Sequence, residues 1–108
     1  MNAIKGCIVQ NRNDADENPA GGSVSGTGLS ITWQDGPLGR GDDRMAPNGA
    51  FVETVISAAK QRIEYYNEGQ FACRENSIAI TKLDEALLWL NKRTVDREER
   101  EVEGTHQA

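Results

Sequence analysis

The sequence is short of the residues on which most active sites depend. It has one histidine, His106, and two cysteines, Cys7 and Cys73, which lie far apart and outside any CxxC pattern. This composition excludes a zinc site built from His and Cys ligands. It also disfavours nucleophilic catalysis by Ser or Cys, because such a nucleophile needs a general base within hydrogen-bond reach and nothing in the sequence positions one. A GxxxxGK[ST] phosphate loop is also lacking. We therefore expect neither catalysis nor a metal nor a cofactor.

Positive charge and long apolar runs are scarce as well. The 108 residues carry a net charge of -5 at pH 7, which disfavours a general DNA or RNA binder because such a protein needs a basic face. No stretch approaches the roughly 18 apolar residues of a membrane span, and the first residues lack the apolar core of a signal peptide. We expect a soluble, intracellular protein with reduced thiols and a small core, for which oligomerisation is a common remedy.

The N-terminal half predicts two strands separated by a polar loop. Residues 3–10 are rich in β-branched side chains, and residues 29–34 alternate between apolar and polar positions. The intervening residues 11–28 are dominated by Gly, Asn, Asp and Ser, which favours a loop. We expect the two strands to pair as an antiparallel hairpin, which is marginal alone and must pack on helices or on another chain.

The C-terminal half predicts two helices. Apolar residues recur at helical spacing from Phe51 to Tyr66, with Asn48 as the expected N-cap. A break at Gly69 separates this helix from a second one that begins near Arg74, whose apolar face comprises Ile80, Leu83, Leu87 and Leu90. Helices joined by so short a link form an antiparallel hairpin.

These elements predict a single α+β domain. Residues 1–47 would form the β-hairpin or small sheet and its loops, packed on a two-helix hairpin over residues 48–104. Gly104 is the expected stop of the second helix, and residues 105–108 form a tail.

Two arginines near the end of the second helix, Arg93 and Arg97, are candidate ligand-binding residues. They are four apart, so they share a helical face on which like charges repel. Their forked donors suit a phosphate, which would cancel that repulsion. The alternative is a solvated helix end, where Arg93 pairs with Asp96 and Arg97 with Glu101.

Asn76 shares the helical face of these arginines but lies about 25 Å away along the axis. Its amide suits a base edge, or it serves as a helix-start residue. Tyr66, and Phe71 in the connecting turn, either stack on a base or close the helical hairpin. One small ligand cannot span that distance, so a shared site requires two chains related by a two-fold axis.

The stretch "EGQFACRENSIAITKLDEALLWLNKRTVDREEREVEGTH" is similar to the C-terminal helical hairpin of a bacteriophage family, the Thoeris anti-defence sponges. "ITWQDGP" and the later "NG" resemble the strand and the start of the first helix in that family. The resemblance covers roughly residues 29–106. The charged segment over residues 35–49 is longer than the family pattern, which leaves the lid of the pocket and the choice of isomer open.

The resemblance implies a non-enzymatic sponge acting in the cytoplasm of the infected bacterium. Its ligands would be cyclic ADP-ribose isomers with a ribose–ribose link, which TIR-domain proteins make and which the sponge holds without cleaving. Related anti-CBASS sponges share the hairpin and hold cyclic di- or trinucleotides. The resemblance further implies a homodimer or homohexamer, with no nucleic acid polymer and no membrane as partner.

The resemblance also assigns roles to six residues at a subunit interface. An aromatic ring stacks on adenine, the Glu-Asn pair of "CREN" lies beside it, and two arginines with a neighbouring threonine hold the pyrophosphate. These residues are Tyr66, Glu75, Asn76, Arg93, Thr94 and Arg97. Two other functions stay open: a module that docks a host protein through its acidic surface and helical face, and a hydrolase of the same signal.

Overall fold

The structure is a computed structural model that describes residues 6–36, 38–39, 42 and 44–99, the side chains of 97–99 excepted. The chain divides into two compact units, and the boundary lies between Phe51 and Val52. Among its described residues, the first unit contains three β-strands and the second contains two α-helices. The α+β fold class and the helical hairpin that the sequence predicts are therefore confirmed.

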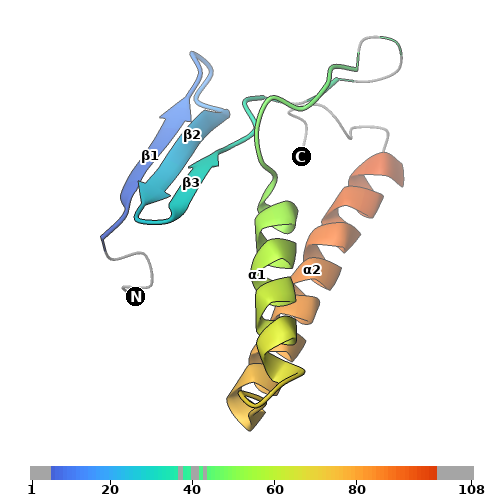
Figure 1. Ribbon diagram of the computed structural model, residues 1–108. Helices are drawn as coiled ribbons and strands as arrows, with labels where there is room; N and C mark the ends of the chain where they lie inside the picture. Colours follow the sequence, from blue (N-terminus) through green and yellow to red (C-terminus); the bar gives the residue numbers. More distant parts are fainter. Residues whose placement is uncertain (1–5, 37, 40–41, 43, 100–108) are drawn as a thin grey trace. The chain divides into compact units, whose positions relative to one another are not determined.

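The first unit is an antiparallel sheet in the order β1-β2-β3. Its strands are β1 (Ile8–Asn13), β2 (Pro19–Gly26) and β3 (Leu29–Thr32), coloured blue to teal in Figure 1. Val24 of β2 pairs with Val9 on one side and with Ile31 on the other. The expected direct pairing of the first and last strands is wrong, because β2 lies between them and occupies a segment predicted as loop.

The middle strand β2 was not predicted from the sequence because it consists mainly of glycine and serine, which do not show the apolar, β-branched pattern of a strand. Glycine is required at its bulge. Gly22 is buried with a φ of 144°, and a Cβ there would collide with the carbonyl oxygen of Gln10. The register of β1 against β2 shifts between Asn11 and Asn13, as expected at a bulge.

A reciprocal pair of side chains closes the segment that follows β3. The amide of Asn48 accepts a hydrogen bond from the backbone of Asp35 (2.8 Å), and Gln34 accepts one from the backbone of Asn48 (2.9 Å). We call this pair the Gln34–Asn48 clasp. Gly49 permits it, since a Cβ there would lie 2.5 Å from the carbonyl carbon of Trp33. Asn48 is therefore not the helix cap that its position predicts.

The second unit consists of α1 (Val52–Asn67) and α2 (Arg74–Glu99), which lie side by side in Figure 1. The predicted end of the first helix and start of the second are confirmed to within a residue. Among the described side chains, polar contacts cross between the helices at Asn67–Ser77 (3.1 Å), Lys60–Asp84 (2.6 Å) and Arg93–Glu53 (3.8 Å). The residue numbers in each pair add to nearly the same total, which fixes the antiparallel register. The predicted stop at Gly104 lies outside the described residues.

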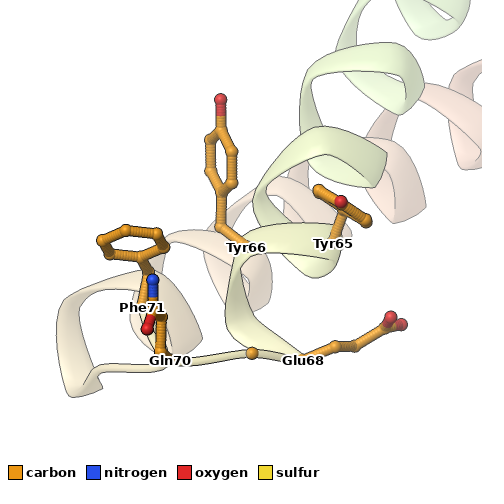
Figure 2. Close-up of a pocket in the computed structure, with 6 residues that line it drawn as sticks. Tyr65, Tyr66, Glu68, Gln70 and Phe71 are labelled. Atoms are coloured by element: carbon orange, nitrogen blue, oxygen red, sulfur yellow. The ribbon is translucent and has the colours of Figure 1, made fainter.

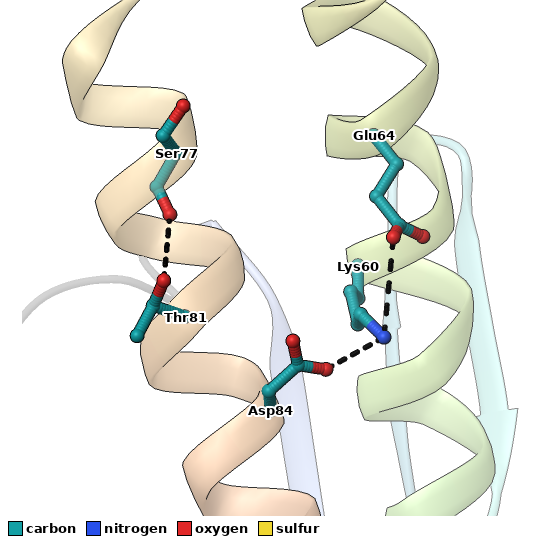
Figure 3. A network of polar contacts seen from close by, with 5 residues as sticks. All are labelled: Lys60, Glu64, Ser77, Thr81 and Asp84. Carbon is teal, nitrogen blue, oxygen red and sulfur yellow. Dashed lines mark hydrogen bonds and ion pairs between the residues drawn. The ribbon is translucent and has the colours of Figure 1, made fainter.

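Lys60 is the centre of the polar contacts between the helices. Its ammonium contacts Asp84 across the hairpin and Glu64 one turn along α1 (4.0 Å), as Figure 3 shows. The hydrogen bond to Asp84 raises the pKa of Lys60 above its ordinary value. A raised lysine pKa stabilises the folded state at every pH below the ordinary value, and this contribution is lost only as the pH rises through the raised one.

The two helices cover their apolar seam only in part. The predicted face of α2, from Ile80 to Leu90, is half-buried, and so are Val55, Ile56 and Ile63 of α1. No hydrophobic side chain among the described residues is fully buried. None of the described helices is both long and apolar enough to cross a bilayer. The apolar contacts within this pair of helices therefore exclude water only in part.

Asn67 ties the end of α1 to the start of α2. Its side-chain oxygen Oδ1 accepts a hydrogen bond from the backbone NH of Cys73 (3.0 Å), and its side-chain Nδ2 donates one to the hydroxyl of Ser77. Because each such bond contributes about 0.5–1.5 kcal/mol, Asn67→Ala should lower the free energy of unfolding by roughly 1–3 kcal/mol. Urea denaturation measures this. Asn91→Ala, on the exposed surface of α2, is the control and should change it little; equal effects would contradict this role.

Candidate functional site

A hollow of about 330 Å³ lies at the tip of the helical hairpin, where α1 ends and the connecting turn begins. Figure 2 shows Tyr66 rising from the end of α1 between Phe71 and Tyr65. The lining residues are Tyr65, Tyr66, Glu68, Gly69, Gln70 and Phe71. Tyr66 and Phe71, the two aromatic residues considered from the sequence as stacking platforms for a base, both line this hollow.

Arg62 holds the two tyrosines of this tip. Its Nε donates a hydrogen bond to the hydroxyl of Tyr66 (3.1 Å), and its guanidinium carbon lies 4.9 Å from the Tyr66 ring centre. The same carbon lies 5.2 Å from the ring of Tyr65. Sequence reasoning missed Arg62, although a residue three and four positions before two aromatic rings on a helix shares their face.

The aromatic cluster can bind a flat, uncharged ring. Phe71 is 66% exposed and Tyr66 is 41% exposed, so neither ring is used to fill a core. A guanidinium in contact with one side of a tyrosine ring orients that ring and adds a cation–π attraction. The other face of such a ring is a stacking platform for a nucleobase, which binds aromatic side chains through its own π-face.

Asn76 supports this tip from the start of α2. Its side-chain amide donates a hydrogen bond to the carbonyl oxygen of Phe71 (3.1 Å), and its backbone NH contacts the sulfur of Cys73 (3.4 Å). The side chain is a donor inside the first turn of α2, whereas a helix cap precedes the helix and accepts from its backbone NH groups. Asn76 is therefore not the helix cap considered from the sequence, and its side chain positions the turn that carries Phe71. Glu75 is exposed beside it, in the first turn of α2.

The second group of candidates lies at the opposite end of α2. Arg93 is 59% exposed and contacts Glu53 of α1, and Thr94 donates a hydrogen bond to the carbonyl oxygen of Leu90 (3.3 Å). Asp96, considered as a partner of Arg93, pairs instead with Lys92 (2.9 Å).

Arg97 belongs to α2, and its side chain lies outside the described part of the structure, as does its candidate partner Glu101. By the helix register, Glu53 near the start of α1 lies level with Arg93. Arg97 is therefore about one turn further along α2 than the first turn of α1 reaches.

The structure therefore gathers the candidates into two groups rather than one. Tyr66, Glu75 and Asn76 lie at the tip of the hairpin, whereas Arg93 and Thr94 lie near the other end of α2. Along the helix axis the distance from Asn76 to Arg93 is about 25 Å. A small ligand cannot contact both groups of a single chain.

Comparison with known proteins identifies relatives of this hairpin. Residues 28–95 match the sequence profile of a family described as "Acb2/Tad1, hairpin domain". A Bacillus phage SBSphiJ7 protein named "Thoeris anti-defense 1" is 46% identical over 78 residues, which make up 72% of this chain and 52% of that relative. The chain thus spans about half the length of that relative. The matched residues include the tip, Arg93 and Thr94, and they end just before Arg97.

Proposed function

The chain belongs to the Acb2/Tad1 hairpin-domain family, and on that basis we propose that it is a phage anti-defence protein that sequesters a cyclic nucleotide signal. The proposed ligands are cyclic ADP-ribose isomers of Thoeris immunity. The protein would hold them without cleaving them, inside the infected bacterium. The name of its phage relative supports the anti-defence part of this proposal.

The aromatic tip carries the proposal. Tyr66 and Phe71 line an open hollow of about 330 Å³, and Arg62 holds the Tyr66 ring from one side. We assign the adenine to this hollow, stacked on Tyr66, with Glu75 and Asn76 beside it. Stacking of one base on an aromatic side chain contributes about 1–3 kcal/mol, which suits reversible capture of a nucleotide.

The pyrophosphate is assigned to Arg93 and Arg97 of a second chain, with Thr94 beside them. Guanidinium groups bind phosphates through two parallel hydrogen bonds. Glu53 contacts Arg93 at 3.8 Å, so a phosphate must displace or outcompete this carboxylate. The distance of about 25 Å between the two groups within one chain supports a site shared by two chains.

Sequestration is favoured over hydrolysis by the chemistry of the side chains. A hydrolase of a pyrophosphate or glycosidic bond needs a positioned acid, base or metal. The only histidine of the sequence, His106, stands near its end. Besides the carboxylate of Glu68, the lining of the tip consists of aromatic rings, an amide and a glycine, and Arg62 adds a guanidinium. These groups suit binding, and Glu68 alone does not supply the paired acid and base that hydrolysis of a glycosidic bond needs.

We expect the full chain to retain a ribose-linked cyclic ADP-ribose through gel filtration and to release it intact when the complex is heated. Chromatography of the released material against the starting ligand measures this. Release of cleaved products would instead indicate a hydrolase. If nothing is retained, with cyclic di- and trinucleotides tested in parallel, the sponge proposal fails and a module that docks a host protein is favoured.

A further inference from the structure

The connecting turn brings a further amide, that of Gln70, to the tip of the hairpin. Gln70 lines the same hollow as Tyr66 and Phe71. Its side chain is exposed, and within the described part of the chain it makes no hydrogen bond to the protein. Its two side-chain N–H groups and its oxygen are therefore available to a ligand that enters the hollow.

The other amide near the tip, that of Asn76, is engaged with the protein itself. Its Nδ2 donates a hydrogen bond to the carbonyl oxygen of Phe71 (3.1 Å). Turning this amide toward a ligand would break that bond and release the turn. Gln70 loses no bond within the protein when it binds, so it is better suited than Asn76 to hydrogen-bond a base.

The backbone that carries Gln70 is fixed on both sides. The backbone NH of Gly69 donates to the carbonyl oxygen of Tyr66 (3.3 Å), and the backbone NH of Ala72 donates to the carbonyl oxygen of Gly69 (3.1 Å). The bond from Asn76 to Phe71 holds the next part of the turn. Only the side-chain rotamers of Gln70 must therefore be ordered when a ligand binds, which limits the entropy lost.

The polar groups of the hollow favour one kind of base edge. A base stacked on Tyr66 or Phe71 presents its edge, and not its face, to the rest of the lining. Of the lining side chains, only the amide of Gln70 places a donor and an acceptor side by side, because the carboxylate of Glu68 accepts and does not donate. Figure 2 also shows Glu68 extending away from Phe71, whereas Gln70 lies on the Phe71 side of the tip. The hollow therefore matches an edge on which a donor is next to an acceptor.

We propose that Gln70 reads the edge of the base bound at the tip and selects adenine, accepting a hydrogen bond from the N6 amino group and donating one to N7. This inference rests on the proposed function and adds a specificity-determining residue to it. Adenine is the base that a side-chain amide matches in this way. Guanine and hypoxanthine carry an oxygen in place of the amino group, so the same edge has two acceptors. Gln70 can satisfy only one of them, and a ligand with such a base binds more weakly.

The first test compares a ribose-linked cyclic ADP-ribose with its hypoxanthine counterpart by isothermal titration calorimetry. The full chain should bind the adenine ligand about 5- to 150-fold more tightly, because one matched pair of hydrogen bonds discriminates between bases by that factor. Gln70→Met keeps the size of the side chain without its amide and should remove most of this preference, chiefly by weakening the adenine ligand. Gln70→Lys should reverse the preference, since an ammonium group donates to both acceptors. Glu68→Gln is the control in the same turn and should keep the preference.

A second measurement does not depend on the cyclic ligand. AMP and IMP are titrated at millimolar concentration into the isotope-labelled full chain, and the side-chain NH₂ signals of Gln70 are followed by NMR. These signals are identified by their absence from Gln70→Met. AMP should shift them, and IMP at the same concentration should shift them less. If the cyclic ligand is not retained but AMP moves these signals more than IMP does, the proposed function fails and the reading of adenine by Gln70 stands.

The proposal is overturned if the chain binds the adenine and hypoxanthine ligands equally, or if Gln70→Met keeps the preference. Loss of the preference in Glu68→Gln but not in Gln70→Met would assign the base edge to the carboxylate, which also overturns it. So would NMR signals of the Gln70 side chain that AMP leaves unmoved or that IMP moves as far. Because Gln70 is exposed and holds nothing in place, its variants should fold like the natural sequence.

Discussion

Replacing Arg93 or Arg97 by alanine is expected to weaken binding of a ribose-linked cyclic ADP-ribose by about 30- to 5000-fold. Removing one member of a buried, charged hydrogen-bonded pair costs about 2–5 kcal/mol, and each 1.4 kcal/mol is a factor of ten in affinity. Isothermal titration calorimetry measures the change.

The fold should survive this replacement of Arg93. Its contact with Glu53 is long at 3.8 Å and solvent-exposed, and exposed ion pairs contribute less than about 1 kcal/mol. Arg12→Ala on β1 removes an exposed arginine elsewhere and should leave binding unchanged. If the Arg93 and Arg97 variants bind like this control, the two arginines are only a solvated helix end.

Loss of the Tyr66 ring should produce the next largest effect, a weakening of about 5- to 150-fold for Tyr66→Ala. The estimate follows from the roughly 1–3 kcal/mol that base stacking contributes per aromatic ring. Tyr66→Phe is the matched control, because it keeps the ring and removes only the hydrogen bond from Arg62. It should retain most of the affinity. Equal losses in both variants would point to the hydroxyl and not to stacking.

Mixing the two kinds of variant tests whether one site draws on two chains. In a dimer of Tyr66→Ala with Arg93→Ala, one site combines both defects and the other combines two intact groups. Random pairing in a two-fold dimer should therefore restore about a quarter of the sites. Titration of tight-binding sites counts them. If mixing restores none, the tip and the arginines do not meet across chains.

The helices were predictable from sequence because their signals are local. Apolar residues at a period of 3.6 and the break at Gly69 define α1 and α2 without reference to the rest of the chain. The aromatic candidate Tyr66 followed from its place at the end of α1. The far candidates, Arg93 and Arg97, followed from their shared helical face, and whether they bind a phosphate is still a prediction.

Tertiary contacts explain what the sequence did not reveal. The strand β2 depends on neighbours on both sides and on a glycine that tolerates the close carbonyl of Gln10. Asn48 satisfies the usual rule for a helix cap, but the backbone of Asp35 engages its side chain. Arg62 was missed because the sequence alone does not show that its guanidinium lies against the rings of Tyr65 and Tyr66.

The Gln34–Asn48 clasp has a consequence for how this family can diversify. It joins the two ends of the segment between Asp35 and Asn48, so the sheet before it and the helix after it do not depend on what that segment contains. Doubling the length of a flexible loop costs only about 0.6 kcal/mol. We therefore expect this segment to tolerate insertions, deletions and replacements, and the amides of Gln34 and Asn48 and the glycine at position 49 to tolerate change poorly.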